Sequence, residues 1–242
     1  MLRPRRLPVI GALLLFSVLF GCTEKLAKQT GLTAPDLFAR GRQKFEARKY
    51  EDAIEAFQVL LERFPNSPLA AKAQLGLADA RMNNKDNVEA EVAFDDFLRL
   101  YPADDNVVYA LYRKGELLTR QVADPGRDQT RTRDAIKAFT QVLERSPQGA
   151  YSRTAAARIG ELRNRLAEHE KRVVAHYIGR KHFAGAEARA RRALSEYPDA
   201  AASPSLLSFL AEALDKQGKK SEAAEVRKSI AEKFPAPGGK KP

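Results

Sequence analysis

The sequence contains no tryptophan, one cysteine, two methionines and three histidines. A single cysteine excludes an intramolecular disulfide and a zinc site built on cysteine thiolates. The three histidines, His169, His176 and His182, have no H-E-x-x-H spacing and no partner ligands at metal spacing, so we expect them to be structural. Neither a G-x-S-x-G sequence nor a phosphate-binding P-loop is present. We therefore expect no metal, no cofactor and no enzymatic activity.

The chain also has a surplus of positive charge. Its 242 residues include 42 Lys and Arg against 31 Asp and Glu, a formal net charge of +11. The 44% hydrophobic and 30% charged residues are typical of a soluble globular protein rather than a disordered one. A protein this basic usually meets nucleic acid, anionic lipid or an acidic protein surface. The N-terminal segment decides among these partners.

Residues 1–21 have the pattern of a secretory signal. Three arginines among the first six residues precede an apolar stretch at 7–20, which is too short to span a hydrocarbon layer of roughly 30 Å as a helix. The stretch ends in the sequence LFGC, which resembles a bacterial lipobox. That resemblance implies cleavage between Gly21 and Cys22 and lipidation of the Cys22 thiol. An ordinary signal peptide with a chance cysteine is the alternative.

The residues after Cys22 give the expected location. Thr23, rather than Asp, follows the cysteine, and by resemblance to the usual sorting pattern this favours the outer membrane, with the protein facing the periplasm. The periplasm contains no DNA, so we expect no nucleic-acid partner despite the charge. Residues 22–35 are mostly polar and are expected to form a flexible tether between the lipid anchor and a folded domain.

Beyond Pro35 the apolar residues recur at i, i+3, i+4 and i+7, which indicates helices, and period-2 alternation is nearly absent. A dipeptide ending in proline recurs along this part of the chain. Because proline lacks an N–H and clashes with the preceding turn, each recurrence predicts the end of a helix. Regular stops of this kind are typical of a solenoid of repeats. The prolines are Pro65, Pro102, Pro147, Pro198 and Pro235.

Small and aromatic residues keep a fixed register to these prolines. An alanine stands twelve residues before each proline, and in the first three repeats Phe57, Phe94 and Phe139 follow four residues later. Ala190 and Arg227 replace the phenylalanine in the last two repeats. The pattern resembles the tetratricopeptide repeat, in which small residues let two antiparallel helices approach closely. The alanines are Ala53, Ala90, Ala135, Ala186 and Ala223.

The predicted fold is therefore all-α, a right-handed α-solenoid of five helix pairs over residues 36–235, with a disordered tail at 236–242. An eight-residue insertion is expected in the third repeat, around 124–130, and an unusually long first helix in the fourth. The expected pairs are 36–47/50–64, 67–83/86–100, 105–122/131–145, 150–181/183–196 and 203–217/219–233.

The positive charge is confined to one region. Residues 22–126 are close to neutral, whereas residues 127–192 contain 16 basic and 7 acidic residues, a net charge of +9. Arginine predominates there, and its planar fork binds carboxylates with two hydrogen bonds. This distribution favours an acidic partner or anionic head groups over a merely solvated surface.

Short stretches in the C-terminal half carry a more specific resemblance. The sequence RNRLAEHE at 163–170, VAHY at 174–177 and YPD at 197–199 resemble corresponding runs of the BamD (YfiO or ComL) family of outer-membrane lipoproteins. The first repeat, residues 41–80, also resembles the opening of that family. The likeness covers about residues 35–235.

The resemblance implies a non-catalytic scaffold of the β-barrel assembly (BAM) complex, which helps to fold and insert barrel proteins into the outer membrane. Its implied partners are a BamA-type barrel subunit, contacted through a POTRA module, other BAM lipoproteins, and unfolded barrel proteins received by the N-terminal repeats. A family arginine that pairs with a POTRA carboxylate aligns with Arg189. We expect Arg189, with Arg191, Arg192 and Arg180, to bind acidic side chains of that module.

Two alternatives stay open at this point. The first is another lipid-anchored repeat scaffold, such as a type IV pilotin-like protein or an adaptor for peptidoglycan enzymes. The second is an enzyme whose site has no recognisable motif.

Overall fold

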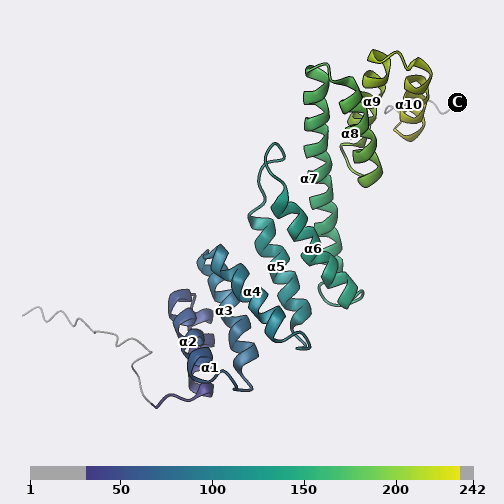
Figure 1. Ribbon diagram of the computed structural model, residues 1–242. Coiled ribbons are helices and arrows are strands. Elements are labelled where there is room, and N and C mark those ends of the chain that lie inside the picture. Colours follow the sequence, from purple (N-terminus) through teal and green to yellow (C-terminus); the bar gives the residue numbers. More distant parts are fainter. Residues whose placement is uncertain (1–30, 235–242) are drawn as a thin grey trace, which may run out of the picture.

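The computed structural model describes residues 31–234, and this part of the chain forms ten helices and no strands. The helices are arranged as five antiparallel pairs that follow one another along an elongated array (Figure 1), which confirms the predicted α-solenoid. Their bounds are α1 Ala34–Glu46, α2 Tyr50–Arg63, α3 Ala70–Asn84, α4 Asn87–Leu100, α5 Val107–Arg120, α6 Thr130–Arg145, α7 Ser152–Gly179, α8 Phe183–Glu196, α9 Ser203–Lys216 and α10 Lys220–Lys233. The predicted signal peptide, the predicted lipidation site Cys22 and the predicted disordered tail at 236–242 lie outside the described residues.

The first helix begins two residues earlier than its predicted start at residue 36. Thr33 is its N-cap, and a capping box joins Thr33 to Asp36: the Thr33 N–H donates to Asp36 Oδ2 at 2.9 Å, and the Asp36 N–H donates to the Thr33 hydroxyl at 3.4 Å. Pro35 fits in the first turn because the N–H that it lacks has no partner within a helix. The boundary of the folded domain is therefore set by this cap rather than by the proline.

The second helix of each of the first four repeats ends two residues before a proline, and its C-cap is the residue directly before that proline; the sequence predicts a stop at these prolines. Phe64, Tyr101, Ser146 and Tyr197 are the C-caps, and each donates its N–H to a carbonyl four residues earlier. The following proline cannot continue the helix, so the chain turns and begins the next repeat.

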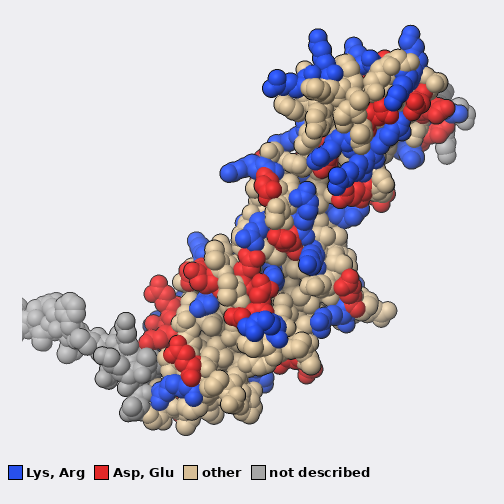
Figure 2. Space-filling model, in the orientation of Figure 1, with Lys and Arg blue, Asp and Glu red and all other residues tan. Residues whose placement is uncertain are grey.

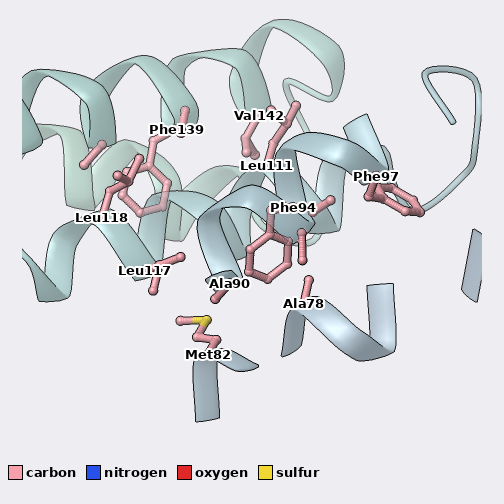
Figure 3. Close-up of a cluster of buried hydrophobic side chains, with 14 of the residues drawn as sticks. Ala78, Met82, Ala90, Phe94, Phe97, Leu111, Leu117, Leu118, Phe139 and Val142 are labelled. Carbon is pink, nitrogen blue, oxygen red and sulfur yellow. The ribbon is translucent and has the colours of Figure 1, made fainter. Parts of the chain in front are cut away.

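Phenylalanine rings fill the space between neighbouring helices. A Cβ added to Gly41 would lie 2.6 Å from the Phe57 ring, and one added to Gly76 would lie 2.7 Å from it, so the ring is held between α1 and α3. Gly115 has the same relation to Phe139, at 2.6 Å, which confirms the predicted insertion in the third repeat. Figure 3 shows Phe94 in the equivalent place, near Ala78 and Ala90.

The helix α7 has 28 residues and connects two parts of the array. Its first half packs against α6 and its second half against α8. Two separate hydrophobic clusters meet along α7. Leu162 belongs to the cluster of the second and third repeats, and Leu166 belongs to the cluster of the fourth and fifth repeats. A third cluster lies in the first repeat and at its contact with α3.

Polar contacts hold α7 close to the boundary between these two hydrophobic clusters. The inserted loop between α5 and α6 lies against α7: Arg165 Nε donates to the Ala123 carbonyl at 2.9 Å, and Arg172 Nη1 donates to Asp124 Oδ1 at 2.8 Å. His169 Nδ1 lies 2.7 Å from the Pro125 carbonyl. These three side chains are spaced i, i+4 and i+7, so one face of α7 holds the loop.

Candidate partner-binding surfaces

Arg189 points from α8 towards α7, where it forms a two-pronged ion pair with Glu170. Its Nη2 donates to Glu170 Oε1 at 3.0 Å, and its Nε donates to Glu170 Oε2. The Glu170 side chain is 14% exposed and that of Arg189 is 32% exposed. The hydrogen bonds that Arg189 donates to Glu170 raise the pKa of the guanidinium above its ordinary value. The residue predicted to meet a partner therefore already has an internal carboxylate.

The other three predicted arginines have different surroundings. Arg191 donates to Glu187 at 3.1 Å and to Glu222 of α10 at 2.7 Å. Arg192 projects into solvent and reaches Glu196 only at 3.8 Å, while Arg180 is exposed in the turn between α7 and α8. Positions 189 and 191 are about 200° apart around a helix, so Arg189 and Arg191 lie on opposite sides of α8. The structure does not bring the four arginines together into one site.

Much of the positive charge in residues 127–192 serves the fold itself. Nine of the thirteen arginines in that range hydrogen-bond or pair within the described chain, to helix ends, loops or carboxylates. Arg163, for example, donates to the Glu196 carbonyl at 2.7 Å and so ties α7 to the end of α8. Many of the arginines in this region therefore stabilise the fold, which the count of charged residues did not show.

The first helices of neighbouring repeats line one side of the array. Contacts join α1 to α3, α3 to α5 and α7 to α9. A groove of about 180 Å³ opens on this side between α1 and α3. Phenylalanine side chains form part of its lining, and basic and acidic side chains form most of the remainder. The lining residues are Phe38, Arg42, Phe45, Glu46, Phe57, Lys72, Gly76 and Asp79.

A buried acidic group links this groove to the third repeat. Asp79 is 9% exposed, and it accepts hydrogen bonds from the Tyr109 hydroxyl at 2.7 Å and from Arg113 Nε at 2.8 Å. Burial, followed by the Asp79 charge, raises the pKa of Tyr109 well above its ordinary value. The Tyr151 ring packs against Tyr109 in a tilted arrangement, with the two ring centroids 5.8 Å apart. This network was not predicted from the sequence, although a lone aspartate in the apolar run of α3 was a possible signal.

The side chains and helices of residues 31–234 also determine whether this part of the chain could bind a metal or span a membrane. No group of three or more His, Cys, Asp or Glu side chains in this range could hold a metal ion. No helix in the same range is both long enough and apolar enough to cross a membrane.

The helix pairs, the capped turns at proline and the glycine–phenylalanine contacts define a helical-repeat protein of the tetratricopeptide type. Residues 31–229 match the YfiO family, described as outer membrane lipoprotein, and the chain belongs to this family. The resemblance inferred from the sequence is thereby confirmed.

Curated relatives carry a consistent name. The chain is 29% identical over 209 residues to the outer membrane protein assembly factor BamD of Neisseria meningitidis serogroup A, covering 82% of this chain and 78% of the relative. It is 26% identical over 238 residues to BamD of Haemophilus influenzae, covering 93% and 90%. Among solved structures, the TPR2AB domain of yeast Sti1, in a complex with pHSP90, is 18% identical with a TM-score of 0.44, covering 84% of this chain and 78% of that one.

Proposed function

We propose that this chain is a non-catalytic scaffold of the β-barrel assembly complex, which assists the folding and insertion of β-barrel proteins into the outer membrane. The observation that carries the proposal is the family match over residues 31–229, which includes nearly all of the solenoid. The relatives' names as assembly factors support it. A solenoid that exposes a long surface suits contacts with several protein partners.

The chain is held at the membrane, in this proposal, by lipid on Cys22 after cleavage between Gly21 and Cys22, and it faces the periplasm. Other lipoproteins of the complex are expected partners as well. The family description as an outer membrane lipoprotein supports this arrangement.

The barrel subunit of the complex is proposed to dock through its POTRA module at Arg189. A guanidinium carries five N–H donors in a fork, and Glu170 engages Nε and Nη2. Nη1 and the second N–H of Nη2 stay available for a carboxylate of the partner. Glu170 then holds the guanidinium in one orientation, so a partner carboxylate meets a preorganised and partly desolvated cation.

Copurification of the barrel subunit tests this docking. Breaking a desolvated charged pair costs about 2–5 kcal/mol, so Arg189→Glu should remove most of the barrel subunit recovered with the protein. Arg153→Glu makes the same change of charge at an exposed residue in the first turn of α7, outside the four arginines predicted to bind the partner, and should have little effect. Circular dichroism should show unchanged helicity in both variants. A Cys22→Ser variant in the same preparation should leave the membrane fraction.

A double variant separates partner binding from the internal ion pair. Arg189→Gln with Glu170→Gln removes both charges and leaves no unpaired charge between α7 and α8. If Arg189 contacts the partner, the double variant loses the barrel subunit as well. Recovery of the barrel subunit with this variant would show that Arg189 acts only within the fold, and would overturn the docking proposal.

Unfolded barrel proteins are proposed to bind the groove between α1 and α3. Barrel strands carry aromatic residues at the membrane interfaces, and extended aromatic segments match a groove lined by three phenylalanines. Lys72 at the groove can pair with a carboxylate of the segment, whereas Arg42 and Glu46 already pair with each other and Asp79 pairs with Arg113. The N-terminal repeats therefore supply substrate contacts, and the C-terminal repeats supply the barrel-subunit contact.

A further inference from the structure

The two edges of the solenoid differ in their basic residues. The turns between repeats contain no Lys or Arg; these are residues 64–69, 101–106, 146–151 and 197–202. The turns within the last two repeats, by contrast, are basic: Arg180 and Lys181 form the turn between α7 and α8, and Lys219 lies in the turn between α9 and α10. Figure 1 shows these two turns at the same end of the array.

Hydrogen bonds bring the two basic turns together. Glu187, in the second turn of α8, accepts from Gln217 Nε2 at 2.9 Å and from Lys219 Nζ at 2.8 Å. The turn between α9 and α10 is therefore fixed beside the start of α8, next to the turn that contains Arg180 and Lys181. Lys216 ends α9 and Lys220 begins α10, so both flank the same junction.

Four cations at this junction are left uncompensated. Three acidic neighbours are already paired: Glu187 with Lys219 and Arg191, Glu222 with Arg191, and Asp215 with Arg227. Glu212 stands four residues before Lys216 in α9 but forms no ion pair with it. The side chains of the four remaining basic residues make no hydrogen bond or ion pair within residues 31–234, and all four residues are exposed. We call these residues the basic tip: Arg180, Lys181, Lys216 and Lys220. Figure 2 shows basic side chains projecting from this end of the molecule.

We propose that the basic tip binds the anionic head groups of phospholipids. The large exposed apolar side chains, Val88, Val92, Leu100 and Phe234, lie outside the tip. Protein interfaces are depleted in lysine and enriched in aromatic residues at their centres, whereas a lysine-rich projection without apolar anchors suits the surface of an anionic membrane. The inference rests on the proposed membrane location and adds a second contact with the bilayer, far along the chain from Cys22.

Vesicle flotation tests this assignment with the chain from residue 22 onward, carrying Cys22→Ser so that no acyl chain contributes. All three hydrophobic clusters lie within this fragment. The parent should bind vesicles containing about 30 mol % phosphatidylglycerol but not pure phosphatidylcholine, and salt should weaken binding. Each cation near an anionic surface contributes about fivefold to partitioning, so Arg180→Gln, Lys181→Gln, Lys216→Gln and Lys220→Gln together should reduce binding several hundredfold.

A charge-matched control variant distinguishes the effect of the basic tip from the effect of the protein's net charge. Arg133→Gln, Lys137→Gln, Arg153→Gln and Lys233→Gln remove four exposed cations elsewhere and should change binding only slightly. Equal losses in both variants, or unchanged binding by the tip variant, would overturn the proposal. So would a tip variant that floats normally but no longer recovers the barrel subunit, because the tip would then be a protein contact. Since flotation needs no barrel subunit, its result is independent of the proposed assembly function.

Discussion

The first three repeats and the last two use different means to hold paired helices together. In the first three, Phe57, Phe94 and Phe139 are buried against glycine or alanine of a neighbouring helix. In the fourth repeat, the same register position is Ala190, which is fully buried, and its cluster consists largely of alanine and leucine. Ion pairs between helices occur in both regions, for example Arg113–Asp79 in the first three repeats and Arg189–Glu170 in the fourth. The comparison teaches that one repeat register can be filled by an aromatic ring or by small side chains.

The exchange in the fourth repeat is reciprocal. Val174 stands where the first repeats have Gly41 or Ala78, and Ala190 stands where they have phenylalanine. The larger side chain has therefore moved from the second helix to the first. In the fifth repeat Arg227 occupies the position on α10, and it pairs with Asp215 at the surface. No helix within residues 31–234 packs over this side of α10, so a polar side chain suits the position.

The largest expected effect is the removal of a ring from the first three repeats. Phe139→Ala would leave a cavity at a fully buried position and should lower the free energy of unfolding by about 3–5 kcal/mol. Arg227→Ala, at the equivalent position of the last repeat, should change stability little because its side chain is 54% exposed. Urea denaturation followed by circular dichroism measures both. Similar losses for the two variants would contradict the comparison.

The reciprocal exchange can be tested by restoring the usual arrangement. Ala190→Phe alone should overpack the fourth repeat and cost about 1–3 kcal/mol. Adding Val174→Ala should make room for the ring, so the double variant should be more stable than the sum of the single effects by at least about 1 kcal/mol. A double-mutant cycle of unfolding free energies gives this coupling. Additive effects would show that Val174 and Ala190 do not share one space.

Two glycines within helices should respond in opposite directions to the same substitution. Gly115→Ala places a methyl group 2.6 Å from the Phe139 ring and should destabilise the protein by about 1–3 kcal/mol. Gly160→Ala in α7 meets no atom within 4 Å and should stabilise it by about 0.5–1 kcal/mol, because alanine favours the helix. Thermal melts of the two variants suffice, and the same sign of change in both would be inconsistent with the packing described.

The smallest expected effect concerns the polar ties of the last repeats. The hydrogen bond from Lys219 holds the pKa of Glu187 below its ordinary value. Its stabilisation is therefore present above the ordinary carboxyl pKa and is lost as the pH falls through the lower pKa of the folded state. Glu187→Gln should cost at most about 1 kcal/mol at pH 7, since its cationic partners are nearly half exposed.

The difference in stability between Glu187→Gln and the parent should shrink towards zero in strong acid. Glu212→Gln, at an exposed glutamate of α9, provides the control and should show a small difference at every pH. Denaturation curves measured from neutral to strongly acidic pH give both profiles. A difference for Glu187→Gln that does not depend on pH would show that the ionised carboxylate is not what stabilises this junction.

The order and length of the helices follow from local chemistry, and the sequence predicts most of them within two or three residues. A proline after the second helix of a repeat stops that helix. The recurring alanine and phenylalanine identify equivalent positions of each repeat even where a loop is inserted between its two helices. The predicted bounds differ at both ends of helices: α3 begins at Ala70 rather than at residue 67, and α7 ends at Gly179 rather than at residue 181. At the start of α1 the cap formed by Thr33 and Asp36 decides the boundary. Several residue types can form such a cap, so the sequence alone does not show which nearby residue begins the helix.

The sequence by itself determined the repeat register, the long α7, the family and the region of positive charge. Tertiary structure alone decided which of those charges are free, because ion pairs such as Arg189–Glu170 and Arg131–Glu91 join residues far apart in the chain. A count of basic residues cannot separate Arg191, held between two carboxylates, from Lys220, which has none within the described residues. Charge is a property of composition, but its availability to a partner depends on which side chains the fold places within hydrogen-bonding distance.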